Sequence, residues 1–179
     1  MKNILLIIFL SIAFLSCKKQ IDELPEATTT GANTFGAKVN GKLWGPMKLG
    51  IAATSPILQA SFAGNNSFRI TARNFASSPN ESEMEIYLRE VTAPGVYQLN
   101  QKTAIQPDAS ASYGFYIERN LMPKNEWITN TQYTGTVTIT RLDIQERIIA
   151  GTFAFRAMNT YNEPAPIEVT EGRFDLKIQ

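Results

Sequence analysis

The sequence predicts an all-β fold, built as an antiparallel β-sandwich or a closed β-barrel of about ten strands. First, short runs in which apolar and polar residues alternate recur at a spacing of roughly 8–12 residues. Second, turn-forming pairs such as Asn40-Gly41 and Pro94-Gly95 separate these runs. Third, beyond the N-terminal apolar run, no segment repeats its apolar residues with the period of an amphipathic helix.

The length and composition limit the function classes that the chain can serve. Its 179 residues suit a single domain, and 44% hydrophobic residues favour a folded chain over disorder. With 17 basic and 16 acidic residues, the net charge of +1 lacks the basic excess of a nucleic-acid-binding protein. The absence of histidine excludes Ser-His-Asp and Cys-His catalysis and imidazole zinc sites, and a single cysteine excludes an intramolecular disulfide. We therefore expect no cofactor and no metal.

The first residues have the organisation of an export signal. A charged start at Lys2 precedes the apolar run Ile4–Leu15, and the small residue Ser16 follows it. As a helix, that run would span only ~18 Å, too little for a hydrocarbon core of ~30 Å. Such a pattern is typical of a cleaved signal peptide, which we place at residues 1–16.

At the end of this signal, Phe14-Leu15-Ser16-Cys17 resembles a bacterial lipobox, with Phe14 at the position that usually holds Leu. The resemblance implies that signal peptidase II cleaves before Cys17 and that this cysteine carries lipid, including acyl chains such as palmitate. Lys18-Lys19 is similar to the start of mature lipoproteins of the Bacteroidota. The alternative is an ordinary secretory signal with an incidental cysteine. The lipobox implies a cell-envelope protein bound to the outer membrane through its acyl anchor, and both a periplasmic and a surface-facing position remain open.

The segment after Cys17 has the composition of a linker. Residues 18–33 contain few large apolar side chains but hold Pro25, Gly31 and three consecutive threonines. At ~3.3–3.6 Å per residue, an extended segment of this length would hold a domain up to ~50 Å from a bilayer. We therefore divide the chain into the signal peptide (1–16), the acylated cysteine with a flexible tether (17–33) and a single β domain (34–179).

The first half of the domain holds strands that are separated by clear turns. Asn40-Gly41 is a strong hairpin signal because a type I′ turn needs positive φ at both central residues. Gly64-Asn65-Asn66 predicts a second hairpin. The strands expected here are residues 34–39, 42–47, 57–63, 67–75, 83–91 and 96–99.

The second half begins with a loop at residues 100–111 and then returns to strands. In the clearest of these, Thr136 and Thr138 share one face while Val137 and Ile139 share the other. Gly172 is expected to mark a bulge in the last strand. The strands expected here are residues 112–119, 127–133, 134–140, 147–157 and 167–178.

Spaced motifs occur near the two ends of the domain. They are Phe35-x-Ala37-x-Val39-Asn40-Gly41-x-x-Trp44 at the start, and Ile139-Thr140-x-x-Asp143, Gly151-Thr152-Phe153-x-Phe155 and Val169-Thr170-x-Gly172-x-Phe174-Asp175 at the end. Together they resemble an uncharacterised lipoprotein family of the Bacteroidota with a domain of unknown function. The resemblance implies a small β lipoprotein without assigned chemistry. Structure alone explains these positions, for example Gly41 by a turn and Trp44 by the core.

Without histidine, an enzyme would depend on carboxylates such as Glu81, Glu83 and Glu85. Alternate residues of a strand share one face, and we expect this face to be solvated, with charges that discourage aggregation. Asp143 beside a turn is expected to serve that turn. No segment has the oxygen-rich pattern of a calcium loop or the glycine-rich pattern of a phosphate loop. We therefore predict no catalytic residue and no metal ligand, and the one site residue that we assign is Cys17, for lipid attachment.

Aromatic side chains are the remaining binding groups, since they stack on sugar rings or line apolar pockets. We expect Trp44 and Trp127 to be buried in the core. Tyr87 and Tyr116 fall on the expected outward faces of their strands and are the better candidates for a surface site.

Three functions fit these observations. The first is a lipid-anchored, non-catalytic binding or accessory module, whose partner is a glycan, a peptide or a protein of an outer-membrane complex. The second is a lipocalin-like barrel that carries a small apolar ligand, and the third is a histidine-free carboxylate hydrolase. A filled core with an exposed patch would favour the first, an apolar hollow the second, and two facing carboxylates in a cleft the third. The sequence indicates no oligomeric state.

Overall fold

The structure is a computed structural model that describes residues 21–48, 56–76, 81–119, 125–161 and 165–179. These residues form eleven strands, so the predicted all-β class is confirmed. The strands are β1 (Thr34–Val39), β2 (Lys42–Trp44), β3 (Leu58–Phe62), β4 (Phe68–Asn74), β5 (Ser82–Leu88), β6 (Gly95–Leu99), β7 (Tyr113–Glu118), β8 (Glu126–Ile128), β9 (Gly135–Asp143), β10 (Ile148–Asn159) and β11 (Ile167–Lys177). Within these ranges, the chain has no helix of the length and apolarity needed to cross a bilayer.

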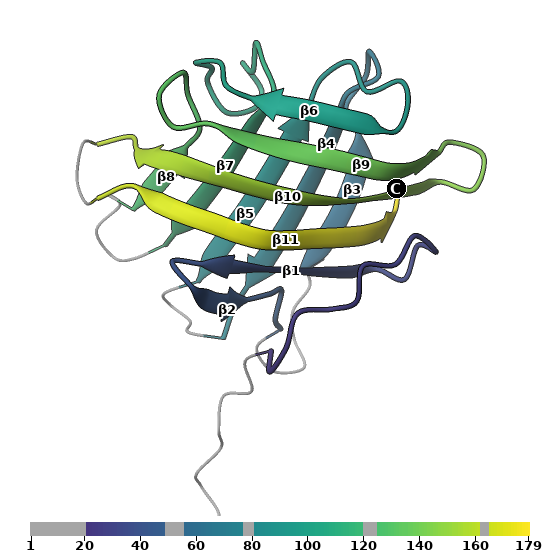
Figure 1. The fold of residues 1–179 in the computed structure, drawn as a ribbon, viewed down its shortest axis with the longest axis horizontal. Helices are drawn as coiled ribbons and strands as arrows, with labels where there is room; N and C mark the ends of the chain where they lie inside the picture. Colours follow the sequence, from purple (N-terminus) through teal and green to yellow (C-terminus); the bar gives the residue numbers. More distant parts are fainter. Residues whose placement is uncertain (1–20, 49–55, 77–80, 120–124, 162–164) are drawn as a thin grey trace, which may run out of the picture.

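The strands pair antiparallel in one curled sheet that forms a half-barrel (Figure 1). We call β6-β9-β10-β11-β1-β2 the front sheet and β8-β7-β5-β4-β3 the back sheet. β10 joins them because it pairs with β9 and β11 along most of its length and with β8 at Met158 and Asn159. On the open side, Ala60 of β3 bridges to Ile178, directly after β11. The architecture thus lies between the predicted sandwich and the predicted closed barrel. The front and back sheets face each other, as in a sandwich, but they are joined along one side, as in a barrel.

The core fills the space between the front and back sheets. Inward side chains from both sheets meet there, such as Phe153 from β10 and Ile86 from β5. Packing against Phe153 is so close that a Cβ added at Gly172 would lie 2.4 Å from the ring. The core therefore requires a glycine at this position of β11.

Local turn chemistry produces the first hairpin and the bulge of the last strand, as the sequence predicts, although β2 ends at Trp44 and is shorter than the strand expected at 42–47. The β1–β2 hairpin turns at Asn40 and Gly41, whose φ values of 48° and 78° suit a type I′ turn. The bulge expected near Gly172 is present, because the register of β11 shifts against both β1 and β10 beside it. The residue with positive φ there is Glu171, at 52°.

Two strand predictions need correction. The strand expected at 127–133 ends at Ile128, because the Asn130 side chain accepts hydrogen bonds from the backbone of Gln132 and Tyr133 and closes a turn. Tyr116, expected to face outward, packs in the core between Trp44 and Trp127.

The reason for the second error is that β7 is buried on both faces. Its other face, with Tyr113, Phe115 and Ile117, joins Tyr87 in a second buried cluster on the outside of the back sheet. The loop at 100–111 reaches over this cluster, and the backbone N–H of Gln106 donates to the Tyr113 hydroxyl at 2.9 Å. A strand that is covered on both sides carries no alternation from which to assign its faces.

Of the segment expected as a tether, residues 17–20 lie outside the described residues, and residues 21–33 pack on the folded body. Residues 21–33, which we call the N-terminal strap, lie on the outer face of the front sheet. A Cβ added at Gly36 would lie 2.6 Å from Pro25, and one added at Gly45 would lie 3.0 Å from Ile21. Among the described residues, the packed part therefore already includes Ile21, whereas the sequence predicted a domain boundary at residue 34.

Candidate functional site

One carboxylate holds the strap on the front sheet. Asp175 of β11 accepts hydrogen bonds from the Thr28 hydroxyl at 2.7 Å and from the backbone N–H groups of Thr30, Gly31 and Ala32 at 2.8, 2.6 and 3.2 Å. The strap covers Asp175 so fully that it is 1% exposed. Each of these bonds joins residues more than 140 positions apart in the chain.

The charge state of Asp175 follows from this cage of donors. Burial opposes the charged form, but the hydrogen bonds, led by that from Thr28, outweigh it and lower the pKa of Asp175. The carboxylate is therefore ionised at neutral pH, and the hydrogen-bond donors of the strap stabilise its negative charge.

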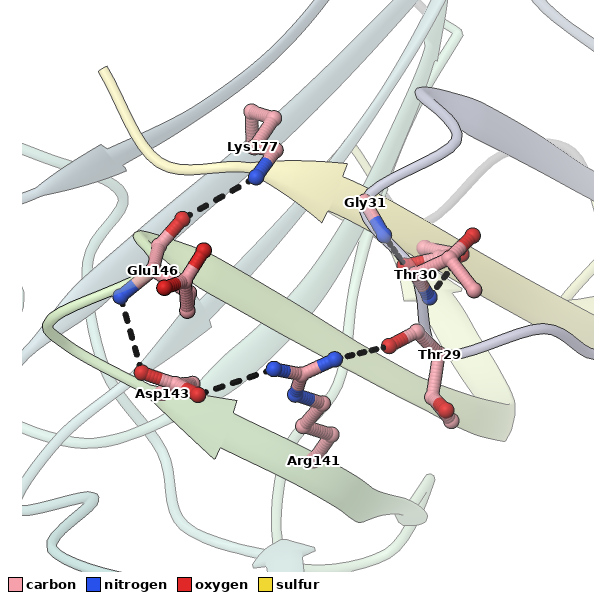
Figure 2. A network of polar contacts seen from close by, with 8 residues as sticks. Thr29, Thr30, Gly31, Arg141, Asp143, Glu146 and Lys177 are labelled. Atoms are coloured by element: carbon pink, nitrogen blue, oxygen red, sulfur yellow. Dashed lines mark hydrogen bonds and ion pairs between the residues drawn. The ribbon is translucent and has the colours of Figure 1, made fainter.

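A second set of contacts ties the strap to the β9–β10 turn (Figure 2). Arg141 donates to the Thr29 carbonyl at 2.7 Å and to the Asp143 carboxylate at 2.8 Å. Asp143 also accepts from the backbone N–H of Glu146, whose carbonyl accepts from Lys177. The hydrogen bond from Arg141 and that from Glu146 lower the pKa of Asp143. Asp143 thus serves its turn, as the sequence predicts.

A groove of about 380 Å³ runs between the strap and the front sheet. Thr136 and Thr138 of β9 and Thr152 of β10 line it, while Ala27 of the strap and Arg173 of β11 also border it. Thr138 and Thr152 are direct cross-strand partners. A hydroxyl both donates and accepts hydrogen bonds, and Glu171 and Arg173 add one charge of each sign to the lining. This lining suits a polar ligand without net charge.

A second hollow of about 280 Å³ on the back sheet contains carboxylates that the sequence analysis singled out. Glu83 pairs with Arg73 at 2.9 Å and with Arg119 at 3.5 Å, and Arg119 also pairs with Glu81 at 3.4 Å. The face is less solvated than predicted, since the Glu83 side chain is only 13% exposed. Each of these two carboxylates faces an arginine, which is the arrangement of a surface ion-pair network.

The third carboxylate, Glu85, accepts a hydrogen bond from the Tyr113 hydroxyl. Burial raises the pKa of Glu85, although the bond from Tyr113 and the charge of Arg69 oppose this. Burial and the neighbouring Glu85 raise the pKa of Tyr113. Since Tyr113 also accepts from Gln106, the pair pins the 100–111 loop to the back sheet.

The aromatic candidates are buried. Trp44 is 5% exposed and donates to Ser82, and Trp127 is 4% exposed and donates to the Ala165 carbonyl, as expected for core residues. Tyr87 and Tyr116 are 5% and 3% exposed, so the prediction that they face solvent is wrong.

An apolar hollow of about 570 Å³ opens beside the strap, between β1 and the start of β3. Ile21 and Pro25 of the strap, Phe35 of β1, and Ile57 and Leu58 line it. Glu23 and Lys48 also line it, so the hollow offers both apolar and charged groups to a ligand.

Sequence reasoning missed Asp175 as the residue that positions the strap. The one signal for it was its place in the C-terminal motif, which did not reveal its partners. Cys17 and residues 1–16, where the sequence predicts a signal peptide, lie outside the described residues. Among the residues that the structure describes, no group of three or more acidic or cysteine side chains lies close enough to hold a metal ion.

Comparison with protein families identifies one match. The model of a domain of unknown function, DUF6252, matches residues 31–175. The matched region thus runs from Gly31 to Asp175, which are hydrogen-bonded to each other. No curated protein and no solved structure matches the chain.

Proposed function

Because the chain belongs to the DUF6252 family, a domain of unknown function, its role must be inferred from its own residues, and we propose that it is a lipid-anchored binding module of the bacterial cell envelope. In this proposal Cys17 carries the lipid, the anchor lies in the outer membrane of a member of the Bacteroidota, and the β domain binds a glycan, a peptide or a protein partner without catalysing a reaction.

The observation that carries the proposal is the fixed position of the strap. The packing of Ile21 against Gly45 leaves only residues 18–20 between the folded body and Cys17. At ~3.3–3.6 Å per residue, the step from Cys17 to Ile21 spans at most ~14 Å. An acylated Cys17 would therefore hold the domain directly against the bilayer, rather than at the end of a long tether.

The surface chemistry supports binding over catalysis. The groove beside the strap offers the hydroxyls of Thr136, Thr138 and Thr152 to a neutral polar ligand. The carboxylates Glu81 and Glu83 are engaged by arginines. Glu171, a carboxylate that lines the same groove, is paired with Lys38. The groove thus offers free hydroxyls, while the carboxylates named here are held in ion pairs.

The anchor is tested by replacing Cys17 with serine in the full chain. We expect the parent protein to incorporate labelled palmitate and to stay with the membranes after a carbonate wash, and Cys17→Ser to lose both properties. Ser16→Ala is the matched control, because it keeps a small residue before the cysteine. A Cys17→Ser protein that still needs detergent for release would refute the anchor.

The apolar hollow beside the strap favours a second candidate function, a carrier of a small apolar ligand. The probe is a fluorescent fatty-acid analogue. If the hollow binds it, Ile57→Asn should weaken binding, whereas Ile144→Asn, at an apolar position that is 61% exposed elsewhere, should not. Failure of the parent protein to bind the probe would reject this candidate.

A further inference from the structure

The two edges of the front sheet differ in how they are protected. At one edge, β2 is three residues long and begins with Lys42. Directly after β2, Ile21 of the strap packs on Gly45. At the other edge, β6 pairs with β9 along its whole length, from Gly95 opposite Ile139 to Leu99 opposite Gly135. β6 pairs with no other strand in the described part of the chain and lies at the upper rim of the front sheet in Figure 1.

β6 lacks the features that usually prevent strand addition. Natural edge strands are protected by charges, prolines, bulges or a covering segment. Residues Gly95–Leu99 contain no charged residue and no proline. Gly95 and Gln98 are exposed, and Val96 is an apolar side chain that is 61% exposed.

The free edge of the back sheet shows the contrast. There, β3 is closed by the C-terminus, since Ala60 bridges to Ile178 and accepts a hydrogen bond from the Gln179 N–H at 2.8 Å. The back sheet therefore protects its long edge with a segment of the same chain, and the front sheet leaves β6 open.

We propose that β6 is the interface for a second copy of this chain, whose own β6 adds antiparallel to form a two-fold dimer. Antiparallel addition places the same five residues on both sides, so that the unpaired backbone groups of each edge meet their complements. No charge is brought against a like charge, because the strand carries none. The contact also removes part of Val96 from water.

The geometry of such a dimer is set by the sheet. The two-fold axis runs perpendicular to the front sheet, so the straps of both copies lie on the same side. A five-residue strand pair buries less than the ~1,200 Å² of a standard stable interface, so the dimer should be weak in dilute solution and form where the chain is concentrated.

Disulfide trapping in intact cells that express the full chain tests the proposal. The variant V96C/Q98C places thiols on the exposed face of β6. Opposite residues of an antiparallel pair have Cβ atoms ~4.5–5.5 Å apart, within reach of a disulfide. After mild oxidation, we expect a band at twice the mass of the chain on a non-reducing gel. The single variants Val96→Cys and Gln98→Cys then report how the two β6 strands are aligned. A single cysteine crosslinks to its copy only when it lies on the two-fold axis of the dimer.

The matched control is T136C/T138C, whose thiols lie on β9 directly opposite Gln98 and Val96. In the dimer these positions lie three strand spacings apart, ~14 Å, which is too far for a disulfide. The parent chain shows any background from Cys17. Adding Gly95→Lys to V96C/Q98C places a charge on the edge without a steric clash and should lower the dimer fraction several-fold.

Three results would overturn the proposal. The first is that V96C/Q98C gives no dimer band. The second is that the cysteine pairs on β6 and β9 give equal dimer bands, and the third is that β6 crosslinks to a different protein in place of a second copy. The last result would assign the same edge to a heterologous partner strand.

Discussion

Replacing Asp175 with asparagine tests whether one carboxylate holds the strap. Oδ2 accepts hydrogen bonds from Thr28, Thr30 and Ala32, and Oδ1 accepts one from Gly31. An asparagine presents oxygen on one side only, so at least one donor faces an NH₂ group and loses its partner. The others exchange a charged acceptor for a neutral one.

The expected loss can be estimated from these contacts. A buried donor without a partner costs about 1–3 kcal/mol, and the release of the strap into water limits the total, so we expect the free energy of unfolding to fall by about 3 kcal/mol. For a domain of this size, that corresponds to a melting temperature lower by about 6–12 °C. Urea unfolding followed by the fluorescence of the buried Trp44 and Trp127 measures the change.

The pH dependence gives an independent check. Burial opposes ionisation of Asp175, but the hydrogen bonds from the strap lower its folded-state pKa below the unfolded value of roughly 3.9. Its contribution to stability is therefore complete above the unfolded pKa and is lost as the pH falls through the folded pKa. The difference between the parent and Asp175→Asn should be full at neutral pH and shrink in strong acid.

The control makes the same chemical change at an exposed position. Asp108→Asn, in the 100–111 loop, should leave the unfolding midpoint unchanged. If Asp175→Asn unfolds at the same urea concentration as the parent, or if its deficit is the same at every pH, the carboxylate does not hold the strap.

Two further predictions concern the core and the back sheet. Gly172→Ala should lower the free energy of unfolding by about 1–3 kcal/mol because its Cβ meets the Phe153 ring. Adding Phe153→Leu should restore part of the loss. If the losses of the two single variants simply add in the double variant, this reason is contradicted. Tyr113→Phe removes the hydrogen-bond donor to the partly buried Glu85. Burial already raises the folded-state pKa of Glu85, and the lost hydrogen bond favoured its charged form. The cost of about 1–3 kcal/mol should therefore be larger at pH 7 than below the unfolded pKa of Glu85. Urea titrations at both pH values measure it, and a cost that does not change with pH would contradict the argument.

Local sequence determined the strands and their turns. Asn40-Gly41 closes the β1–β2 hairpin because those two residues accept positive φ, whatever surrounds them. In β9, the alternation of Thr136 and Thr138 with Val137 and Ile139 correctly separates the outer face from the core, because only one face of that strand is covered. Such signals depend on neighbours a few residues away, so they can be read without knowing the fold.

Tertiary structure decided which surfaces are covered and by what. β7 is buried on both faces because the 100–111 loop reaches over Tyr113, so alternation could not assign Tyr116 to the core. The strap reads as a linker because its anchor, Asp175, lies more than 140 residues away along the chain. A long-range hydrogen bond leaves no periodic pattern in the segment that it holds. Among the described strands, the pairing of β6 with β9 alone likewise depends on how the other strands pair, so no pattern within residues 95–99 predicts it.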